Sequence, residues 1–149
     1  MRIVAKNKKA YFEYEILEKY EAGICLLGNE VKSILSVGMS IKEAYIKISE
    51  NELILFNSHV SKYKYSGKEN FDEYRDRKLL LHKNEISKII SKIQSKSYTL
   101  IPVNVYLNSS NLLKVEIAIA KGKKLFDKRI ALKEKDLKRE LNQIKKYGQ

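Results

Sequence analysis

Apolar residues recur at every second position along much of this chain, which is the period of a half-buried β-strand. Such segments lie at residues 12–16, 44–48, 53–56, 99–107 and 115–119. A short apolar run at 24–27 predicts one more strand. Turn-forming residues at 49–51 and 109–111 separate two pairs of these segments, so the pattern predicts two β-hairpins.

Two other segments follow a helical period. The four isoleucines of residues 86–93 fall at i, i+3, i+4 and i+7 with lysines on the other side, which predicts an amphipathic helix. A shorter helix is expected over residues 28–38, where Asn29 can cap the first turn and Glu30 suits its positive end.

Many short strands with few helices favour a mainly β (α+β) fold, an antiparallel barrel of the oligonucleotide-binding (OB) type with two or three packed helices. A plain α+β sheet is the close alternative. The first ten residues predict a basic arm, and the polar, Tyr-rich segment 61–78 predicts a long loop. Pro102 has no backbone donor and is expected near a strand end or at an edge.

The charge of the chain is strongly uneven. Thirty Lys and Arg against 18 Asp and Glu give a net charge of +12, and residues 121–149, with eleven basic and four acidic residues, carry +7 of it. This excess favours a polyanionic partner, either nucleic acid or an acidic membrane surface. We expect a barrel domain at 1–120 and a basic C-terminal tail at 121–149. The tail has too few apolar residues to hold a helix alone, so we expect it to be mobile when free and helical when bound.

The remaining composition narrows the class of protein. An apolar content of 44% is that of a folded domain. No apolar run approaches the ~18 residues of a membrane helix, and no signal-like block lies near the N-terminus, so we expect a cytoplasmic protein. His59 and His82 have no partners at ligand spacing, and Cys25 is the single cysteine. Neither a metal site nor another cofactor is expected.

Six sequence runs carry a resemblance to a known family. They are NKKA at 7–10, ILEKYEAGI at 16–24, GNEVKS at 28–33, RKLLLHK at 77–83, LIP at 100–102 and AKGKKLFDKR at 120–129. In this order, and over nearly the whole chain, they resemble the SsrA-binding protein family. Phe12, Leu35 and Asn104 depart from the pattern, since the family often has His, Arg and Lys there.

The resemblance implies an OB-type barrel that binds the tRNA-like part of transfer-messenger RNA (tmRNA) and catalyses no reaction. It implies the stalled ribosome as a second partner, whose empty messenger channel the basic tail would probe in trans-translation. Two rival functions make different demands on the residues. An enzyme acting on RNA would need paired carboxylates, a histidine pair or a Gly-rich cofactor loop, none of which the sequence offers. The second rival is a constitutive ribosomal protein, which would sediment with every ribosome and not mainly with stalled ones.

The resemblance also supplies candidate site residues. The RNA-contact candidates are Asn7, Lys8, Lys9, Glu21, Gly28, Glu30, Lys32, Leu80, Lys121, Gly122, Lys123 and Lys124, and the ribosome-sensing candidates in the tail are Asp127, Lys128 and Arg129.

Each kind of candidate also has an ordinary structural reading. The N-terminal lysines suit a solvated arm, Glu21 a surface salt bridge, Glu30 a helix N-terminus and Leu80 a core strand. Four aromatic residues lie among cations in the long loop, and they suit base stacking and loop packing equally. They are Tyr63, Tyr65, Phe71 and Tyr74.

Overall fold

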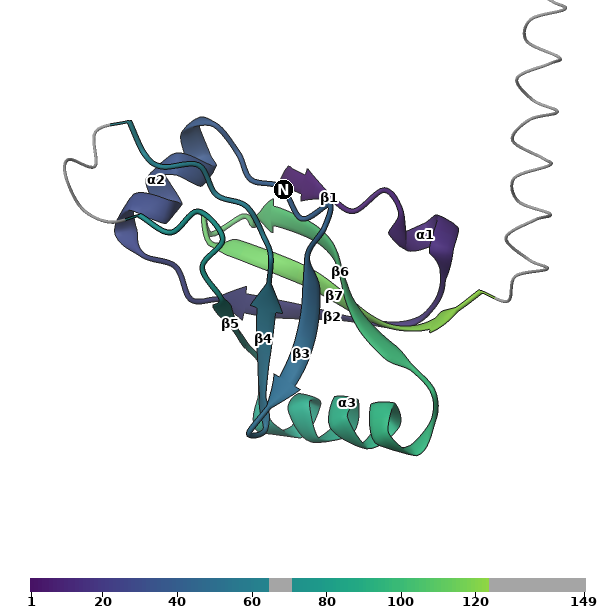
Figure 1. Ribbon diagram of the computed structural model, residues 1–149. Coiled ribbons are helices and arrows are strands. Elements are labelled where there is room, and N and C mark those ends of the chain that lie inside the picture. Colours follow the sequence, from purple (N-terminus) through teal and green to yellow (C-terminus); the bar gives the residue numbers. More distant parts are fainter. Residues whose placement is uncertain (65–70, 124–149) are drawn as a thin grey trace, which may run out of the picture.

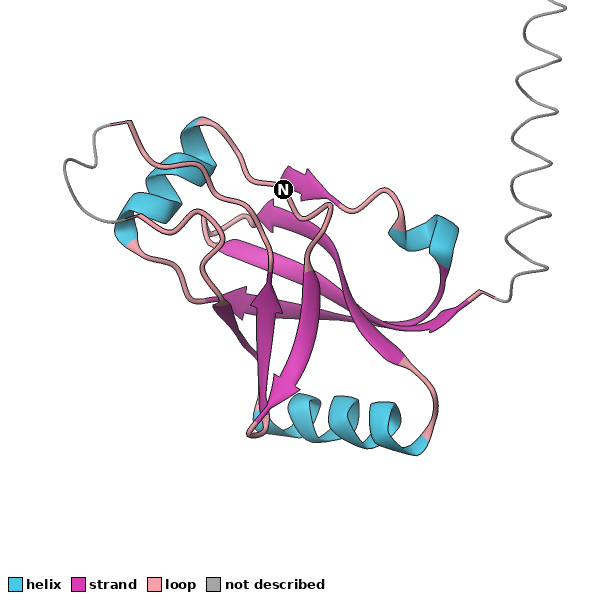
Figure 2. Ribbon diagram, viewed as in Figure 1, coloured by secondary structure: helices cyan, strands magenta, loops and turns pink. Residues whose placement is uncertain are grey.

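The alternating segments pair into one antiparallel sheet. The computed structural model describes residues 1–64 and 71–123, and within them the sheet has seven strands (Figures 1 and 2). They are β1 (Arg2–Lys6), β2 (Tyr14–Ile24), β3 (Tyr45–Ser49), β4 (Glu52–Phe56), β5 (Arg77–Leu80), β6 (Thr99–Leu107) and β7 (Leu113–Gly122). Their order across the sheet is β1-β6-β7-β2-β5-β4-β3.

The sheet curls until its two ends approach each other. β3 and β4 cross in front of β2, β6 and β7 in Figure 1, and β3 contacts β6. In the described part of the chain no backbone ladder joins these two strands, so the barrel is only partly closed. Alternate side chains such as Ile46, Leu55 and Ile117 point inward and form one buried core. The predicted antiparallel, OB-type barrel is confirmed, as against a plain sheet.

Three helices accompany the strands, namely α1 (Ala10–Glu13), α2 (Gly28–Ser36) and α3 (Lys83–Ser95). α3 lies across one end of the barrel, where Ile89 is fully buried in the core, so the predicted amphipathic helix is confirmed (Figure 1). α1 packs on the outside of the sheet, where Ala10 joins a second, smaller apolar cluster. None of these three helices, the only ones in the described residues, is long and apolar enough to cross a membrane.

The two predicted hairpins are also confirmed. Glu50 and Asn51 join β3 to β4 with φ angles of 50° and 61°. Two left-handed central residues give the turn whose twist matches that of the flanking strands. Residues 108–112 join β6 to β7, and there Asn111 has a φ of 59°.

The N-terminal third differs from the prediction. Residues 2–6, expected as a basic arm, form β1 and pair with the end of β6. The separate strands expected at 12–16 and 24–27 are replaced by α1 and by the single long strand β2. β5 begins at Arg77, inside the expected loop. These strands are stabilised by partners far along the chain, which local alternation does not report.

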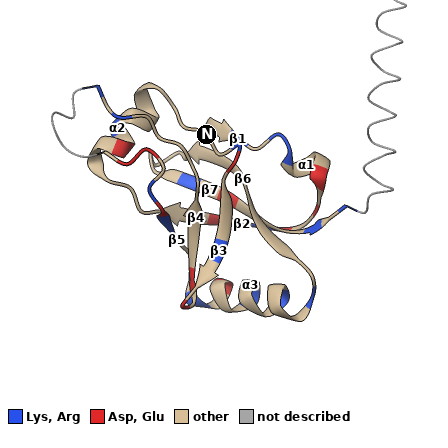
Figure 3. Ribbon diagram, in the orientation of Figure 1, with Lys and Arg blue, Asp and Glu red and all other residues tan. Residues whose placement is uncertain are grey.

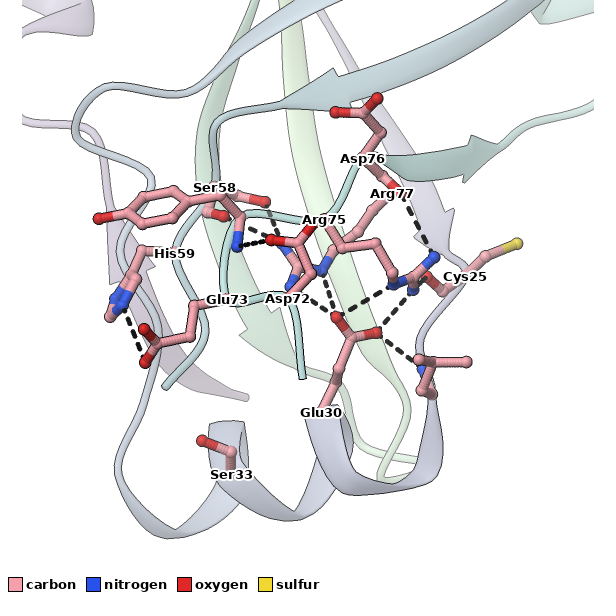
Figure 4. A network of polar contacts seen from close by, with 12 residues as sticks. Cys25, Glu30, Ser33, Ser58, His59, Asp72, Glu73, Arg75, Asp76 and Arg77 are labelled. Atoms are coloured by element: carbon pink, nitrogen blue, oxygen red, sulfur yellow. Dashed lines mark hydrogen bonds and ion pairs between the residues drawn. The ribbon is translucent and has the colours of Figure 1, made fainter. Parts of the chain in front are cut away.

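A buried ionic cluster fixes α2 to the barrel (Figure 4). Arg77 is fully buried and donates to Glu30 from Nε at 2.9 Å and from Nη2 at 2.5 Å. It also donates to the backbone oxygen and hydroxyl of Ser58 at 3.0 and 2.8 Å. Arg75 donates to Glu30 at 2.6 Å. The cluster therefore joins α2, β5 and the segment after β4.

Glu30 also organises the start of α2. Its carboxylate accepts the backbone N–H of Leu27 at 2.8 Å, so the helix begins at Gly28 and the predicted cap at Asn29 is wrong. Burial opposes the charged form of Glu30, but hydrogen bonds from Arg75, the Leu27 amide and Arg77 outweigh it. Together they hold the pKa of Glu30 below its ordinary value.

Candidate RNA-binding surface

Glu21 lies on the outer face of β2 with an exposed side chain. Side chains alternate between the two faces of β2, and the next residue, Ala22, is fully buried in the core. The hydroxyl of Tyr106, on β6, donates a hydrogen bond to the Glu21 carboxylate. Burial and this carboxylate raise the pKa of the Tyr106 hydroxyl well above its ordinary value, so the phenol keeps its proton and holds Glu21 in place.

Leu80 lies on the same outer face, on the neighbouring strand β5. It is directly opposite Gly23 and is 48% exposed, so the core reading of this leucine is wrong. A Cβ at Gly23 would be 3.3 Å from the Leu80 Cβ, so the glycine gives the leucine its room. Glu21 and Leu80 line one hollow together with Gly23, Leu81, His82, Glu85 and Lys114. The fold thus brings together two candidates that are far apart in the sequence.

A second, more apolar hollow also has Leu80 in its lining. It is lined by residues of α2, of the ends of β2, β5 and β6, and of the β6–β7 loop. Leu35 and Leu112 line it and are 39% and 55% exposed. An exposed apolar surface beside a carboxylate can receive the face of an unstacked base while the acid accepts from the base edge.

Polar contacts continue along the outer face from Glu21 towards α1. Glu116, on β7, is opposite Glu21 and lies 3.4 Å from the Lys19 ammonium. Asn104 donates to Glu116 at 3.3 Å, and Lys19 donates to the hydroxyl of Tyr11 at 2.6 Å. The hydrogen bond to Tyr11 raises the pKa of Lys19, with a further contribution from Glu116. These residues connect the Glu21 hollow to α1.

Asn7, Lys8 and Lys9 lie between β1 and α1. The Asn7 side chain donates to the backbone oxygen of Pro102 at 2.9 Å, and the Asn7 backbone donates to Val103 at 2.8 Å. Asn7 thus covers the stretch of β6 beyond the last residue paired with β1. Pro102 lies in this stretch, inside an interior strand and beside an irregularity in the β6–β7 register, whereas the sequence predicted a strand end or an edge. Lys8 and Lys9 are exposed, and the Lys9 ammonium lies 3.9 Å from the Glu43 carboxylate in a surface ion pair.

Lys121, Gly122 and Lys123 lie beside the other end of α1. Lys121 and Gly122 still belong to β7, opposite Glu15 and Tyr14. Strand β7 therefore extends two residues past the expected boundary at residue 120. Figure 3 shows basic positions both before α1 and at the end of β7. Lys124, Asp127, Lys128 and Arg129, and with them the expected mobile tail, lie outside the described residues.

The three candidates on α2 have different environments. Glu30 is 1% exposed and bound by two arginines, so it is not available to RNA here, and its role is structural. Gly28 is exposed, with open space around its Cα. Lys32 is exposed and its ammonium lies 5.8 Å from the centre of the Tyr63 ring. An acid at the start of a helix predicts an exposed charge, but in the fold Arg75 and Arg77 enclose the Glu30 carboxylate.

Three of the four aromatic residues of the long segment, Tyr63, Phe71 and Tyr74, have neighbours in the described structure. Tyr74 is 53% exposed and its ring centre is 4.9 Å from that of His59. Phe71 lines a hollow at the start of α2, whereas Tyr65 lies outside the described residues. Tyr63 and Tyr74 therefore take part in packing of the segment, and base stacking stays a prediction.

Within residues 1–64 and 71–123, no group of three or more His, Cys, Asp or Glu side chains could hold a metal ion. His59 lies 3.6 Å from Glu73, at the surface, while Cys25 is partly buried beside the ionic cluster.

Together these features define a class of protein. A partly closed OB-type barrel whose outer face carries an exposed acid, an exposed leucine and flanking lysines is typical of a small RNA-binding barrel. A family model described as "SmpB protein" matches residues 4–147. The chain therefore belongs to the SmpB family, as the resemblance predicted.

Relatives and a solved structure agree with this assignment. The SsrA-binding protein of Fervidobacterium nodosum is 48% identical over 148 residues, 99% of each chain. That of Persephonella marina is 48% identical over 147 residues, covering 99% of this chain and 95% of the relative. A chain from a structure described as "tmRNA-SmpB: a journey to the center of the bacterial ribosome" superposes with a TM-score of 0.64 and 39% identity, over 80% of this chain and 84% of the other.

Proposed function

We propose that this protein is an RNA-binding adaptor in trans-translation. It binds the tRNA-like domain of tmRNA, delivers it to stalled ribosomes and probes the empty messenger channel with its C-terminal tail. The observation that carries the proposal is the match to the SmpB family over residues 4–147, together with a shared fold at 39% identity. The protein acts in the cytoplasm, where ribosomes are found.

The barrel supplies the RNA contacts in this proposal. Glu21 accepts hydrogen bonds from a base edge or a ribose hydroxyl, and Leu80 packs against an unstacked base beside it. The shared hollow supports this pairing, because it places both side chains within reach of one nucleotide loop. Lys8, Lys9, Lys121 and Lys123 around α1 contact phosphates, which position the RNA without reading its sequence.

The proposed role requires no chemistry at the protein surface. Members of the family serve as adaptors, and the proposal is that this chain catalyses no reaction. Incubating labelled tmRNA with the protein should leave its length and base composition unchanged. Cleavage or modification that depends on a described side chain would favour the enzyme hypothesis instead.

Binding of tmRNA should depend steeply on salt. If about five phosphates are neutralised, the affinity should fall by about 100-fold or more between 50 and 200 mM salt, because bound cations are released from the RNA. A titration followed by filter binding or fluorescence anisotropy measures the slope. An affinity that hardly changes over this range would argue against an interface made largely of lysine–phosphate contacts.

Glu21 should contribute a specific contact that salt does not reproduce. Glu21→Gln keeps the size of the side chain but removes its charge, and we expect a roughly tenfold loss of tmRNA affinity, since hydrogen bonds to charged groups are the stronger ones. Glu50→Gln, in the exposed β3–β4 turn, removes the same charge from a residue that does not line the hollow and should change the affinity by less than about twofold. Equal affinities for the two variants would remove Glu21 from the interface.

A further inference from the structure

An aromatic pair lies on the outer face of the β3–β4 hairpin. Tyr45 and Phe56 are cross-strand neighbours whose ring centres are 5.5 Å apart, with an angle of 11° between the ring planes. Their neighbours Ile46 and Leu55 point into the core, so the two rings must face outward. The Lys47 ammonium lies 5.4 Å from the centre of the Tyr45 ring and 5.9 Å from that of Phe56.

This pair is not covered by the rest of the described fold. Tyr45 is 44% exposed and Phe56 is half-buried. In Figure 2, α1, α2 and α3 lie at the margins of the barrel and leave the face of β3 and β4 open. β3 is also an edge of the sheet in the described part of the chain. Stacked aromatic rings with a cation beside them form a surface that accepts further planar groups.

A groove connects this pair to the basic residues before α1. It runs between the β3 edge and the start of β6, where the barrel lacks a backbone ladder. Its walls include Lys9, Lys42, Lys47 and Tyr45 together with Asn7. Two acids, Glu13 and Glu43, also line it, and three lysines leave the walls with a positive balance. The surface thus offers cations along a path that ends at an aromatic stack.

We propose that this groove holds an unpaired segment of the RNA partner, with one base stacked on Tyr45 and its phosphates beside Lys42 and Lys47. The inference rests on the proposed function and adds to it a second RNA contact, on a different face from the Glu21 hollow. The alternation of cations with an exposed aromatic ring favours RNA over an apolar peptide, because every base offers a planar face and every nucleotide an anion. Stacking tolerates any base, so this contact adds affinity and little sequence preference.

The chain contains no Trp, which allows a direct optical test. Tyr45→Trp in the full-length protein places a single indole in the proposed stack. On saturation with in vitro transcribed tmRNA, its fluorescence should be strongly quenched by the stacked base. Val37→Trp, at a 76% exposed residue just after α2 that lines neither the groove nor the two hollows beside Leu80, is the control and should change little. Unchanged emission from Tyr45→Trp at saturating tmRNA would overturn the proposal.

Affinity measurements complete the test. Tyr45→Ala should weaken tmRNA binding by about tenfold, whereas Tyr45→Phe, which keeps the ring, should stay within about twofold of the unaltered protein. If Tyr45→Ala binds normally while Glu21→Gln loses affinity, the groove is not an RNA site but the proposed function stands. If the unaltered protein does not bind tmRNA, the proposed function itself fails. Displacement of the RNA by a protein partner that quenches the same indole would assign the groove to that partner.

Discussion

Replacing Glu30 by alanine should lower the free energy of unfolding by about 3–5 kcal/mol, because it leaves a buried charge without its partner. The Arg77 side chain is fully buried, and without Glu30 it would keep Ser58 as its one hydrogen-bond partner among the described residues. Arg75 would lose its carboxylate as well, and the Leu27 amide its acceptor. The cluster joins three elements, so the damage would reach α2, β5 and the segment after β4.

The measurement is chemical denaturation followed by far-ultraviolet circular dichroism. Glu52→Ala serves as the control, since Glu52 pairs with Lys78 at 2.9 Å but both side chains are largely exposed. Its loss should cost about 0–1 kcal/mol, the range of surface ion pairs. Similar losses for Glu30→Ala and Glu52→Ala would show that burial does not distinguish the two pairs.

The same cluster predicts a dependence of stability on pH. The pKa of Glu30 is lowered in the folded protein, so its contribution is fully present above the ordinary carboxyl pKa of about 4.3 and is lost as the pH falls through the lower folded value. The difference in unfolding free energy between the unaltered protein and Glu30→Gln should therefore shrink below about pH 4. A difference that stays constant down to the acid transition would mean that Glu30 titrates normally.

Much of the barrel could be predicted from local patterns. The isoleucines of α3 and the alternation in β3, β4, β6 and β7 report burial that each element shows by itself. β1 has no such signal, because its ladder partners are Asn104 to Leu107, far along the chain. The sequence predicts two separate strands in place of β2, because Lys19 and Glu21 in the middle of this strand are exposed to solvent.

The candidate site, too, could be predicted only in part from the sequence. Sequence runs named Glu21 and Leu80 separately, but only the pairing of Gly23 with Leu80 across β2 and β5 places them in one hollow. The sequence does not predict Tyr106 as a site residue, because this tyrosine is 85 residues from Glu21 and only the order of strands in the sheet brings its hydroxyl to the Glu21 carboxylate. For Glu30 the sequence favours a helix N-terminus and an RNA contact about equally, because it does not show that two arginines some 45 residues away enclose the carboxylate.

The largest functional effect is expected from the segment beyond the described barrel. A chain that stops after Lys123 keeps all of β7, the backbone bond from Lys123 to Glu13 and the whole Glu21 hollow. We expect its tmRNA affinity to fall by less than about tenfold, through lost phosphate contacts only. Tagging of peptides on stalled ribosomes, measured in a reconstituted translation system, should fall to background, because the basic tail is proposed to enter the messenger channel.

Full-length variants in the same assay distinguish an effect of particular tail residues from an effect of the total charge of the tail. Replacing Asp127, Lys128 and Arg129 by alanine should abolish most tagging and leave tmRNA binding intact. The matched control replaces Asp136, Lys138 and Arg139, which are the same three residue types and change the net charge equally. It should retain most of the activity if residues 127–129 make the decisive contact. Equal losses in the two variants would mean that the ribosome responds to the total charge of the tail, since counterion release depends on the number of cations rather than on their order.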